Sequence, residues 1–196
     1  MTEVLAELFS SKLRAAVLGH LLARPHLAFS LTDLSRLLDL PISSLQHECY
    51  KLVRIGVLRD ARAGNARLYR PDGRCPLLPT LTALVLAALG PEAALAAALE
   101  GVPGLDLALV AGPIRPSAGE AGPTQLVLVG DLPLEAVDAA LARVGAVLDP
   151  PRGVNQLELA YFRPPDWRAR LADGNRYLTE LLAGPTVALV GAVAPS

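Results

Sequence analysis

The sequence predicts an α/β (α+β) protein made of two dissimilar parts. In the first part, amphipathic helical segments precede two short strands that meet at a Gly-Asn turn. In the second part, strands and helices alternate, which is typical of a sheet covered by helices. The parts also differ in charge, because residues 1–79 contain 11 Lys/Arg and 7 Asp/Glu, whereas residues 80–196 contain 7 and 12. This asymmetry favours contact with a polyanion by the first part only.

Composition narrows the class of protein. Hydrophobic residues make up 52% of the 196-residue chain and the mean hydropathy is +0.40, enough for a substantial core. No apolar run approaches the roughly 20 residues of a membrane-spanning helix, and the first residues hold acids where a signal peptide has bases. We therefore expect a cytoplasmic protein without membrane contact. Cys49 and Cys75 are isolated and the three histidines are scattered, which argues against a disulfide framework and against a metal site.

The first two helices are predicted at residues 12–23 and 33–38. Both segments place apolar residues at helical spacing. Ser10 or Ser11 is placed to cap the first helix and Thr32 to cap the second, because a hydroxyl oxygen accepts a hydrogen bond from the free N–H groups at a helix start.

A third helix is predicted to begin at Ser43 or Ser44 as its cap and to run through Ile55, where Gly56 is placed to end it. Its buried stripe is expected to comprise Leu45, Cys49, Leu52 and Val53. Its opposite face carries Ser44, Gln46, His47, Tyr50, Lys51 and Arg54.

Two short strands, residues 57–59 and 67–70, flank a turn at residues 63–65. Apolar and basic residues alternate around the Gly-Asn pair, a pattern that predicts a β-hairpin. The order helix, helix, turn, helix, hairpin is the layout of a winged helix-turn-helix domain, which we place at residues 1–79.

The predicted hairpin is rich in arginine, which points to DNA. In such a domain the third helix enters the major groove by its N-terminal part, and the hairpin presents cations to the phosphate backbone. Gln46 can pair bidentately with adenine, and Ser43, Tyr50 and Lys51 are better placed for phosphates. We expect the guanidinium groups and the polar helix face to form one continuous surface. The predicted DNA-binding residues are Ser43, Ser44, Gln46, His47, Tyr50, Lys51, Arg54, Arg59, Arg62, Asn65, Arg67 and Arg70.

Residues 80–103 are rich in Leu and Ala and poor in charge. They predict a helical linker of two helices separated at Gly90-Pro91. Helices this apolar must be buried, either in a dimer contact or within their own chain. Beyond them, strands are predicted at residues 105–111, 125–130, 154–162 and 187–190, and helices at residues 134–144, 166–171 and 176–182.

The segment LVRIGVLRDARAGNARLYR, with the helices before it, resembles the winged helix domains of arsenic-repressor-like bacterial regulators over residues 8–71. The resemblance implies a homodimer on a pseudo-palindromic double-stranded DNA site. The Cys/His sets with which some such regulators sense metals are not visible in this sequence.

Residues 104–191 resemble, in the order of elements and in apolar pattern, a small nucleotidyltransferase-like domain that follows a winged helix in one group of bacterial proteins. The resemblance implies a Gly-Ser motif where this chain has Gly112-Pro113, and an Asp-x-Asp motif where it has Pro123 and Gln125. Nucleotidyl transfer needs carboxylates that hold Mg²⁺, and Glu158 on the third strand would stand alone. We therefore expect a degenerate domain at residues 104–196, with no catalysis and no cofactor.

These features predict a sequence-specific transcriptional regulator that binds double-stranded DNA as a homodimer. One alternative is an active metal-dependent nucleotidyltransferase, and another is an accessory protein that binds DNA without sequence preference. Without catalysis, the second part of the chain can have one of three roles: it binds a small-molecule or nucleotide effector, it binds a protein, or it fixes the geometry of a dimer. Arg115, in the loop between the first two strands of that part, is a hypothetical contact for a phosphate-bearing ligand.

Overall fold

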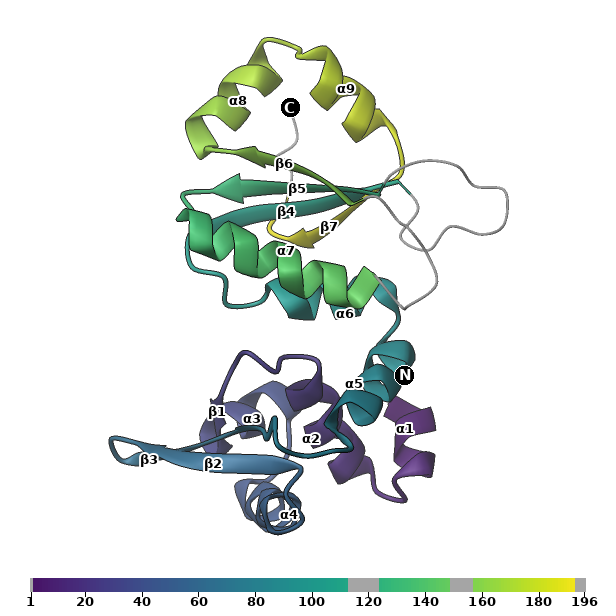
Figure 1. The fold of residues 1–196 in the computed structure, drawn as a ribbon, viewed down its shortest axis with the longest axis vertical. Helices are drawn as coiled ribbons and strands as arrows, with labels where there is room; N and C mark the ends of the chain where they lie inside the picture. The colour runs from purple at the N-terminus through teal and green to yellow at the C-terminus, as the bar shows by residue number, and fades with distance from the viewer. Residues whose placement is uncertain (1, 113–123, 149–156, 193–196) are drawn as a thin grey trace. The chain divides into compact units, whose positions relative to one another are not determined.

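The computed structural model describes residues 2–112, 124–148 and 157–192 (Figure 1). The fold is α+β, as the sequence predicts. The chain divides into two compact units, Met1–Gly90 and Pro91–Ser196, so the break falls between the two apolar helices predicted within residues 80–103. The left-handed backbone of Gly90 (φ +82°) ends the earlier of those helices.

The first unit joins helices to a small antiparallel sheet with strand order β1-β3-β2. Its elements are α1 (Thr2–Leu8), α2 (Lys12–Leu22), β1 (Phe29–Ser30), α3 (Leu31–Leu38), α4 (Ile42–Arg54), β2 (Leu58–Ala63), β3 (Ala66–Pro71) and α5 (Leu78–Leu89). Helix α1 and strand β1 were not predicted. The predicted strand at 57–59 begins one residue before β2 and ends well before β2 does, and the predicted strand at 67–70 lies within β3.

Two predicted helix caps are wrong. Helix α3 is capped by Ser30, not Thr32: the Ser30 hydroxyl oxygen accepts from the Asp33 N–H at 3.1 Å, and the Asp33 carboxylate accepts from the Ser30 N–H at 3.1 Å. This reciprocal capping box lowers the pKa of Asp33, chiefly through the hydrogen bonds from Ser30. Helix α4 begins after Pro41, with no side-chain cap, so Ser43 and Ser44 lie inside its first turn. The cap of α2 is Ser11, one of the two predicted candidates.

Helix α4 is fastened to α2 by a buried carboxylate. Arg14 Nε donates to Glu48 Oε1 at 2.6 Å, and Glu48 is only 4% exposed. Its place on the buried side of α4 was not anticipated, because an acidic residue on a helix is usually exposed.

We expect Arg14→Ala to lower the free energy of unfolding of the first unit by about 2 kcal/mol, since it leaves the Glu48 carboxylate buried without its cation. The exposed pair Arg36–Asp33 is a matched control, and Arg36→Ala should cost no more than about 0.5 kcal/mol. Urea unfolding followed by circular dichroism measures both. Equal costs for the two variants would contradict the assignment, and Arg14→Met with Glu48→Leu should recover most of the loss.

The second unit is a mixed sheet with helices on both faces. Its elements are α6 (Pro91–Leu99), β4 (Leu105–Ala111), β5 (Thr124–Gly130), α7 (Leu134–Leu148), β6 (Leu157–Phe162), α8 (Pro164–Ala172), α9 (Arg176–Ala183) and β7 (Thr186–Val190). The strand order is β6-β5-β4-β7, with β5 and β6 parallel and the other pairs antiparallel.

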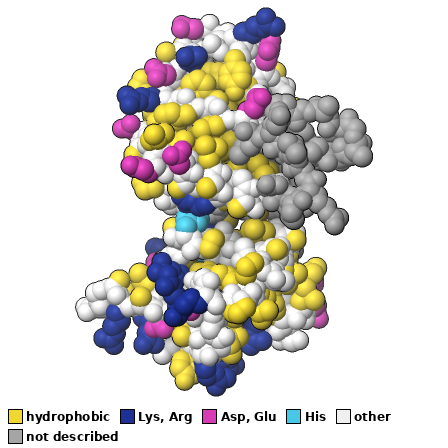
Figure 2. Space-filling view, in the orientation of Figure 1, with side chains coloured by type: hydrophobic (Ala, Val, Ile, Leu, Met, Phe, Trp, Pro, Cys, Tyr) yellow, Lys and Arg dark blue, Asp and Glu magenta, His cyan; other side chains and the backbone are white. Residues whose placement is uncertain are grey.

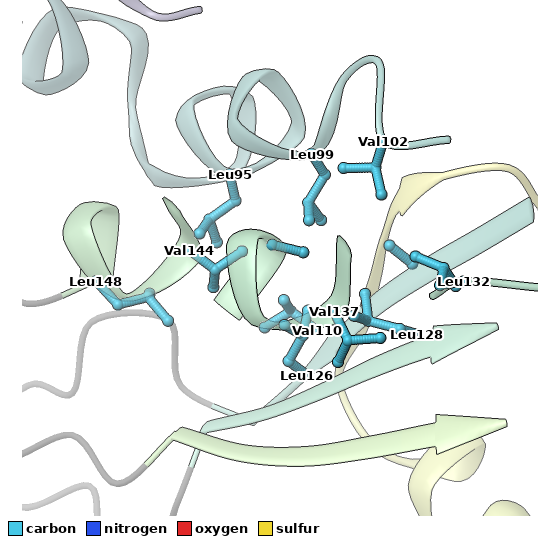
Figure 3. Close-up of a cluster of buried hydrophobic side chains, with 12 residues drawn as sticks. Leu95, Leu99, Val102, Val110, Leu126, Leu128, Leu132, Val137, Val144 and Leu148 are labelled. Atoms are coloured by element: carbon cyan, nitrogen blue, oxygen red, sulfur yellow. The ribbon is translucent and has the colours of Figure 1, made fainter. Parts of the chain in front are cut away.

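Alternate residues of the central strands feed two apolar cores. Helices α6 and α7 cover one face, where Leu95 and Val137 pack against Leu126 and Leu128 (Figure 3). Helices α8 and α9 cover the other face (Figure 1), where Trp167 and Leu178 belong to the same cluster as Leu107, Leu109 and Val127. Because both faces are covered, β4 and β5 read as continuous apolar runs rather than as alternating ones.

Most predicted element bounds in the second unit agree with the structure to within a few residues. Strand β4 has the predicted bounds, and α7 runs four residues past its predicted end at 144. Residues 154–156 of the predicted third strand lie outside the described residues, as does the loop containing Arg115. Among the described residues, no single helix is both long and apolar enough to cross a membrane.

Candidate nucleic-acid interface

Helix α4 presents a polar face at the end of a helix–turn–helix. Asp39 ends α3 in the left-handed region (φ +53°), and Pro41 then begins α4. Ser43, His47 and Arg54 recur at helical spacing, so they lie on one side of α4 and all are exposed. Tyr50 lies in the middle of this stripe with 60% of its surface exposed.

The side chains on this face are not occupied within the chain. In the described ranges, Ser43, Gln46, His47 and Arg54 form no side-chain hydrogen bond and no ion pair. Exposed donors and acceptors held on a helix, with no partner of their own, are available to a ligand. Of the remaining predicted contacts on α4, Ser44 is exposed and Lys51 is half-buried.

The opposite side of α4 serves the core. Leu45, Cys49 and Leu52 are buried as predicted, whereas Val53 is only half-buried and Glu48 takes a buried place. Burial raises the pKa of the Cys49 thiol to about 12, so this thiol stays protonated and acts as an apolar side chain.

Strands β2 and β3 form the predicted hairpin, joined at Gly64-Asn65, with Gly64 in the left-handed region (φ +59°). The pairing sets Arg59 directly opposite Arg70, and Arg62 directly opposite Arg67. Both pairs are exposed.

These two arginine pairs point to opposite faces of the hairpin, so the prediction of one continuous surface is wrong. Side chains alternate between faces along a strand, and Arg59 and Arg62 are three residues apart. Arg62 and Arg67 share a face with Leu58 and Tyr69, which are buried nearer the base of the hairpin. Arg59 and Arg70 lie on the other face.

Two arginines near the hairpin already have acidic partners. Arg67 Nε lies 2.9 Å from Asp60 Oδ2. Arg74 donates to both oxygens of Asp72, at 3.1 and 2.9 Å, and these hydrogen bonds hold the pKa of Asp72 at about 2. The charge of Arg74 is therefore largely satisfied within the chain.

Five cations of α4 and the hairpin remain without an acid within 4 Å among the described residues: Lys51, Arg54, Arg59, Arg62 and Arg70. Figure 2 shows Lys and Arg side chains gathered over the hairpin and α4. Like charges directly opposite each other destabilise a hairpin, and an anion placed between them would relieve the repulsion. The arrangement therefore favours a polyanionic ligand.

One exposed apolar residue was missed in the sequence. Ile42, at the start of α4, is 47% exposed and lies one turn before Gln46. An apolar side chain in this position suits contact with a thymine methyl group. Pro41 was the available signal, because proline is tolerated at a helix start but not in a helix interior, which places the start of α4 at Pro41 or directly after it.

In the second unit, Gln125 of β5, where the resemblance implies the second Asp of an Asp-x-Asp motif, lies beside a carboxylate of β6. Gln125 and Glu158 are direct neighbours in the parallel β5–β6 pair, and Gln125 Nε2 donates to Glu158 Oε2 at 3.0 Å. Glu158 therefore accepts from an amide where the resemblance would place a second metal-binding carboxylate. Across residues 2–112, 124–148 and 157–192, no three His, Cys, Asp or Glu side chains are grouped to hold a metal ion. Pro113 and Pro123 lie outside the described residues.

Comparison of the chain with protein-family models, with curated proteins and with solved structures finds no significant match.

Proposed function

We propose that the first unit binds double-stranded DNA through α4 and the β2–β3 hairpin, and that the protein is a sequence-specific transcriptional regulator. The observation that carries the proposal is the exposed stripe of α4, whose side chains have no partners in the described chain. The charge supports it, since residues 1–90 contain 11 Lys/Arg and 7 Asp/Glu. The excess of cations lies in the unit that carries this stripe.

The division of the arginines between two hairpin faces suits a ribbon that enters a groove. The DNA minor groove is only about 6 Å wide and has a phosphate backbone on each side. A hairpin lying between those backbones meets phosphates on both faces, so Arg59 and Arg70 contact one DNA strand while Arg62, on the opposite face, contacts the other. In the same complex α4 enters the major groove.

The residues of α4 then divide by task. Ile42, Gln46 and His47 lie in its first half and face base edges, whereas Tyr50 and Arg54 lie further along and contact phosphates. Phosphate contacts give affinity and register, and base contacts give sequence preference.

We expect Gln46→Ala to reduce discrimination at one base pair of the preferred site by about 1–3 kcal/mol, because it removes a bidentate contact. Binding to random DNA should stay within twofold of wild type, since Gln46 carries no charge. Titration against the preferred site and its single-base variants measures this. Thr179→Ala, at an exposed position of α9 in the second unit, is the control. A uniform loss over every sequence would contradict base reading by Gln46.

A second copy of the chain is the proposed partner in binding, and the apolar faces of α1 and α5 support it. These helices pack against each other. Val4 and Leu8 of α1 are 63% and 60% exposed, and Leu84 of α5 is 36% exposed. Light scattering should report a dimer, and Leu8→Glu with Leu84→Glu should shift it to monomer. A monomeric wild-type protein at micromolar concentration would contradict this part of the proposal.

The second unit is proposed to be non-catalytic. The Gln125 amide donates a hydrogen bond to the Glu158 carboxylate, and a metal site would need a second carboxylate in the place of that amide. The rival proposal is a nucleotidyltransferase. Incubation with labelled nucleoside triphosphates and Mg²⁺ or Mn²⁺ separates the two, and metal-dependent transfer of label would favour the rival.

Selection of genomic DNA fragments by the full-length protein is the decisive experiment. A regulator should enrich a few fragments that share a two-fold symmetric motif. An accessory protein without sequence preference should bind random and selected fragments alike, with a steep salt dependence in both cases. Absence of any DNA binding at low salt would overturn the proposal.

A further inference from the structure

The second unit contains a pocket at the end of its sheet that lies beneath α8. The pocket measures about 400 Å³ and lies wholly among described residues of that unit. This volume falls within the range of small-molecule sites, roughly 300–1,000 Å³. It is lined by Asp106, Leu107, Val129, Pro164, Trp167, Arg168, Leu171 and Ala192.

The wall of the pocket is apolar and includes one aromatic ring. Leu107, Val129 and Trp167 belong to the core between the sheet and α8, and each is less than a tenth exposed. The ring of Trp167 packs against Phe162 with 5.5 Å between the ring centres, so its orientation is set by the core. A fixed aromatic surface in an apolar pocket favours a planar apolar ligand.

A cation stands at the mouth of this pocket. Arg168 Nε donates to the Pro164 carbonyl at 3.1 Å, which leaves the terminal nitrogens of its guanidinium group as donors. Arg168 is exposed and forms no ion pair within the described residues. Asp106 also lines the pocket and is exposed. Arg168 is held by its own helix next to Trp167, whereas the Asp106 carboxylate forms no hydrogen bond or ion pair with the described residues.

We propose that this pocket binds a small aromatic monoanion, such as an aryl carboxylate, with the ring against Trp167 and the carboxylate on the Arg168 guanidinium. A planar guanidinium group matches a carboxylate with two parallel hydrogen bonds. The ring replaces water at the apolar wall, and the anion remains at the open rim.

The pocket is separate from the Gln125–Glu158 pair. Gln125 and Glu158 lie near the start of β5 and β6, whereas Val129 lies at the end of β5 and Asp106 at the start of β4. The antiparallel β4–β5 pairing puts these groups at opposite ends of the sheet. The inference concerns the second unit and does not depend on DNA binding by the first.

The test uses three probes of one shape and different charge: phenylacetate, phenylacetamide and phenethylamine. Trp167 is the single tryptophan of the chain, so selective excitation of its fluorescence reports on this pocket in the full-length protein, and calorimetry gives the affinity. We expect phenylacetate to bind at least about tenfold more tightly than phenylacetamide, the effect of one charge-assisted contact.

Three variants at exposed positions make the test specific. Arg168→Gln should remove the advantage of phenylacetate, whereas Arg170→Gln, which removes a cation of the same helix that lies over Phe162 instead, should keep it. Ala192→Leu, at an exposed position of the lining, should block all three probes by filling the pocket. Tighter binding of phenethylamine would overturn the anion assignment. Absence of saturable binding up to probe solubility, or binding unchanged by Ala192→Leu, would overturn the site itself.

Discussion

Removing two unpaired cations of the interface together, as Arg54→Gln with Arg62→Gln, is expected to weaken DNA binding about 100-fold. One arginine belongs to α4 and the other to the hairpin, and neither has an acid within 4 Å in the described chain. Each hydrogen bond to a phosphate contributes about 1.5–3 kcal/mol. The slope of log K against log salt should also become shallower by about 2, because about one fewer counterion is released per lost phosphate contact.

The matched control removes the same charge elsewhere. Arg163→Gln with Arg170→Gln takes two exposed arginines from the second unit and should change both quantities little. Fluorescence anisotropy across a salt series measures the affinity and its slope. If the two double variants weaken binding equally, net charge governs the interaction and the α4–hairpin interface is wrong.

Gly130→Ala is expected to destabilise the second unit by about 3 kcal/mol, because the added methyl group would overpack two closely approaching backbone segments. A Cβ atom at Gly130 would lie 2.1 Å from the carbonyl oxygen of Gly104. That oxygen accepts the hydrogen bond of the Asp131 N–H at 3.0 Å, so the backbone cannot give way without losing it. Gly104 has a left-handed conformation (φ +77°), and a Cβ atom added at Gly104 would clash with the backbone of Asp131.

The control for this prediction is a glycine at which alanine should raise the free energy of unfolding instead of lowering it. Gly145 lies inside α7, and a Cβ atom there would meet nothing within 4 Å. Gly145→Ala should stabilise the unit by about 0.5–1 kcal/mol, because glycine loses more conformational freedom in a helix than alanine does. Denaturant unfolding followed by Trp167 fluorescence reports on this unit. Similar midpoints for the two variants would show that the close approach of Gly104 and Gly130 is not required.

Local patterns were enough to predict most elements, because each depends on residues close together in the chain. The strand at 105–111, the helix from 134 and the hairpin with its Gly-Asn turn all follow from apolar spacing and turn residues. The errors at helix starts were also local. Helix α4 begins after Pro41 without a side-chain cap, and Ser30 caps α3 because Asp33 completes the reciprocal pair. The predicted caps were hydroxyl side chains two or three residues further along the chain.

The division of the hairpin arginines was readable from the sequence as well. Residues three apart in a strand face opposite sides, so Arg59 and Arg62 had to separate once the strand reached both. The predicted strand ended at Arg59 and left Arg62 in the loop, which is why their faces were not compared.

The sequence by itself determined the order of elements, the charge contrast between the two parts and the polar face of α4, because these depend on composition and on neighbours along the chain. Tertiary structure alone decided three other properties. Glu48 is buried against Arg14, the Gln125 amide is hydrogen-bonded to the Glu158 carboxylate, and Trp167 and Arg168 line one pocket with Asp106. Each depends on side chains brought together from segments distant in the chain or from different elements, and chain spacing carries no information about such contacts until the sheet and helices have packed.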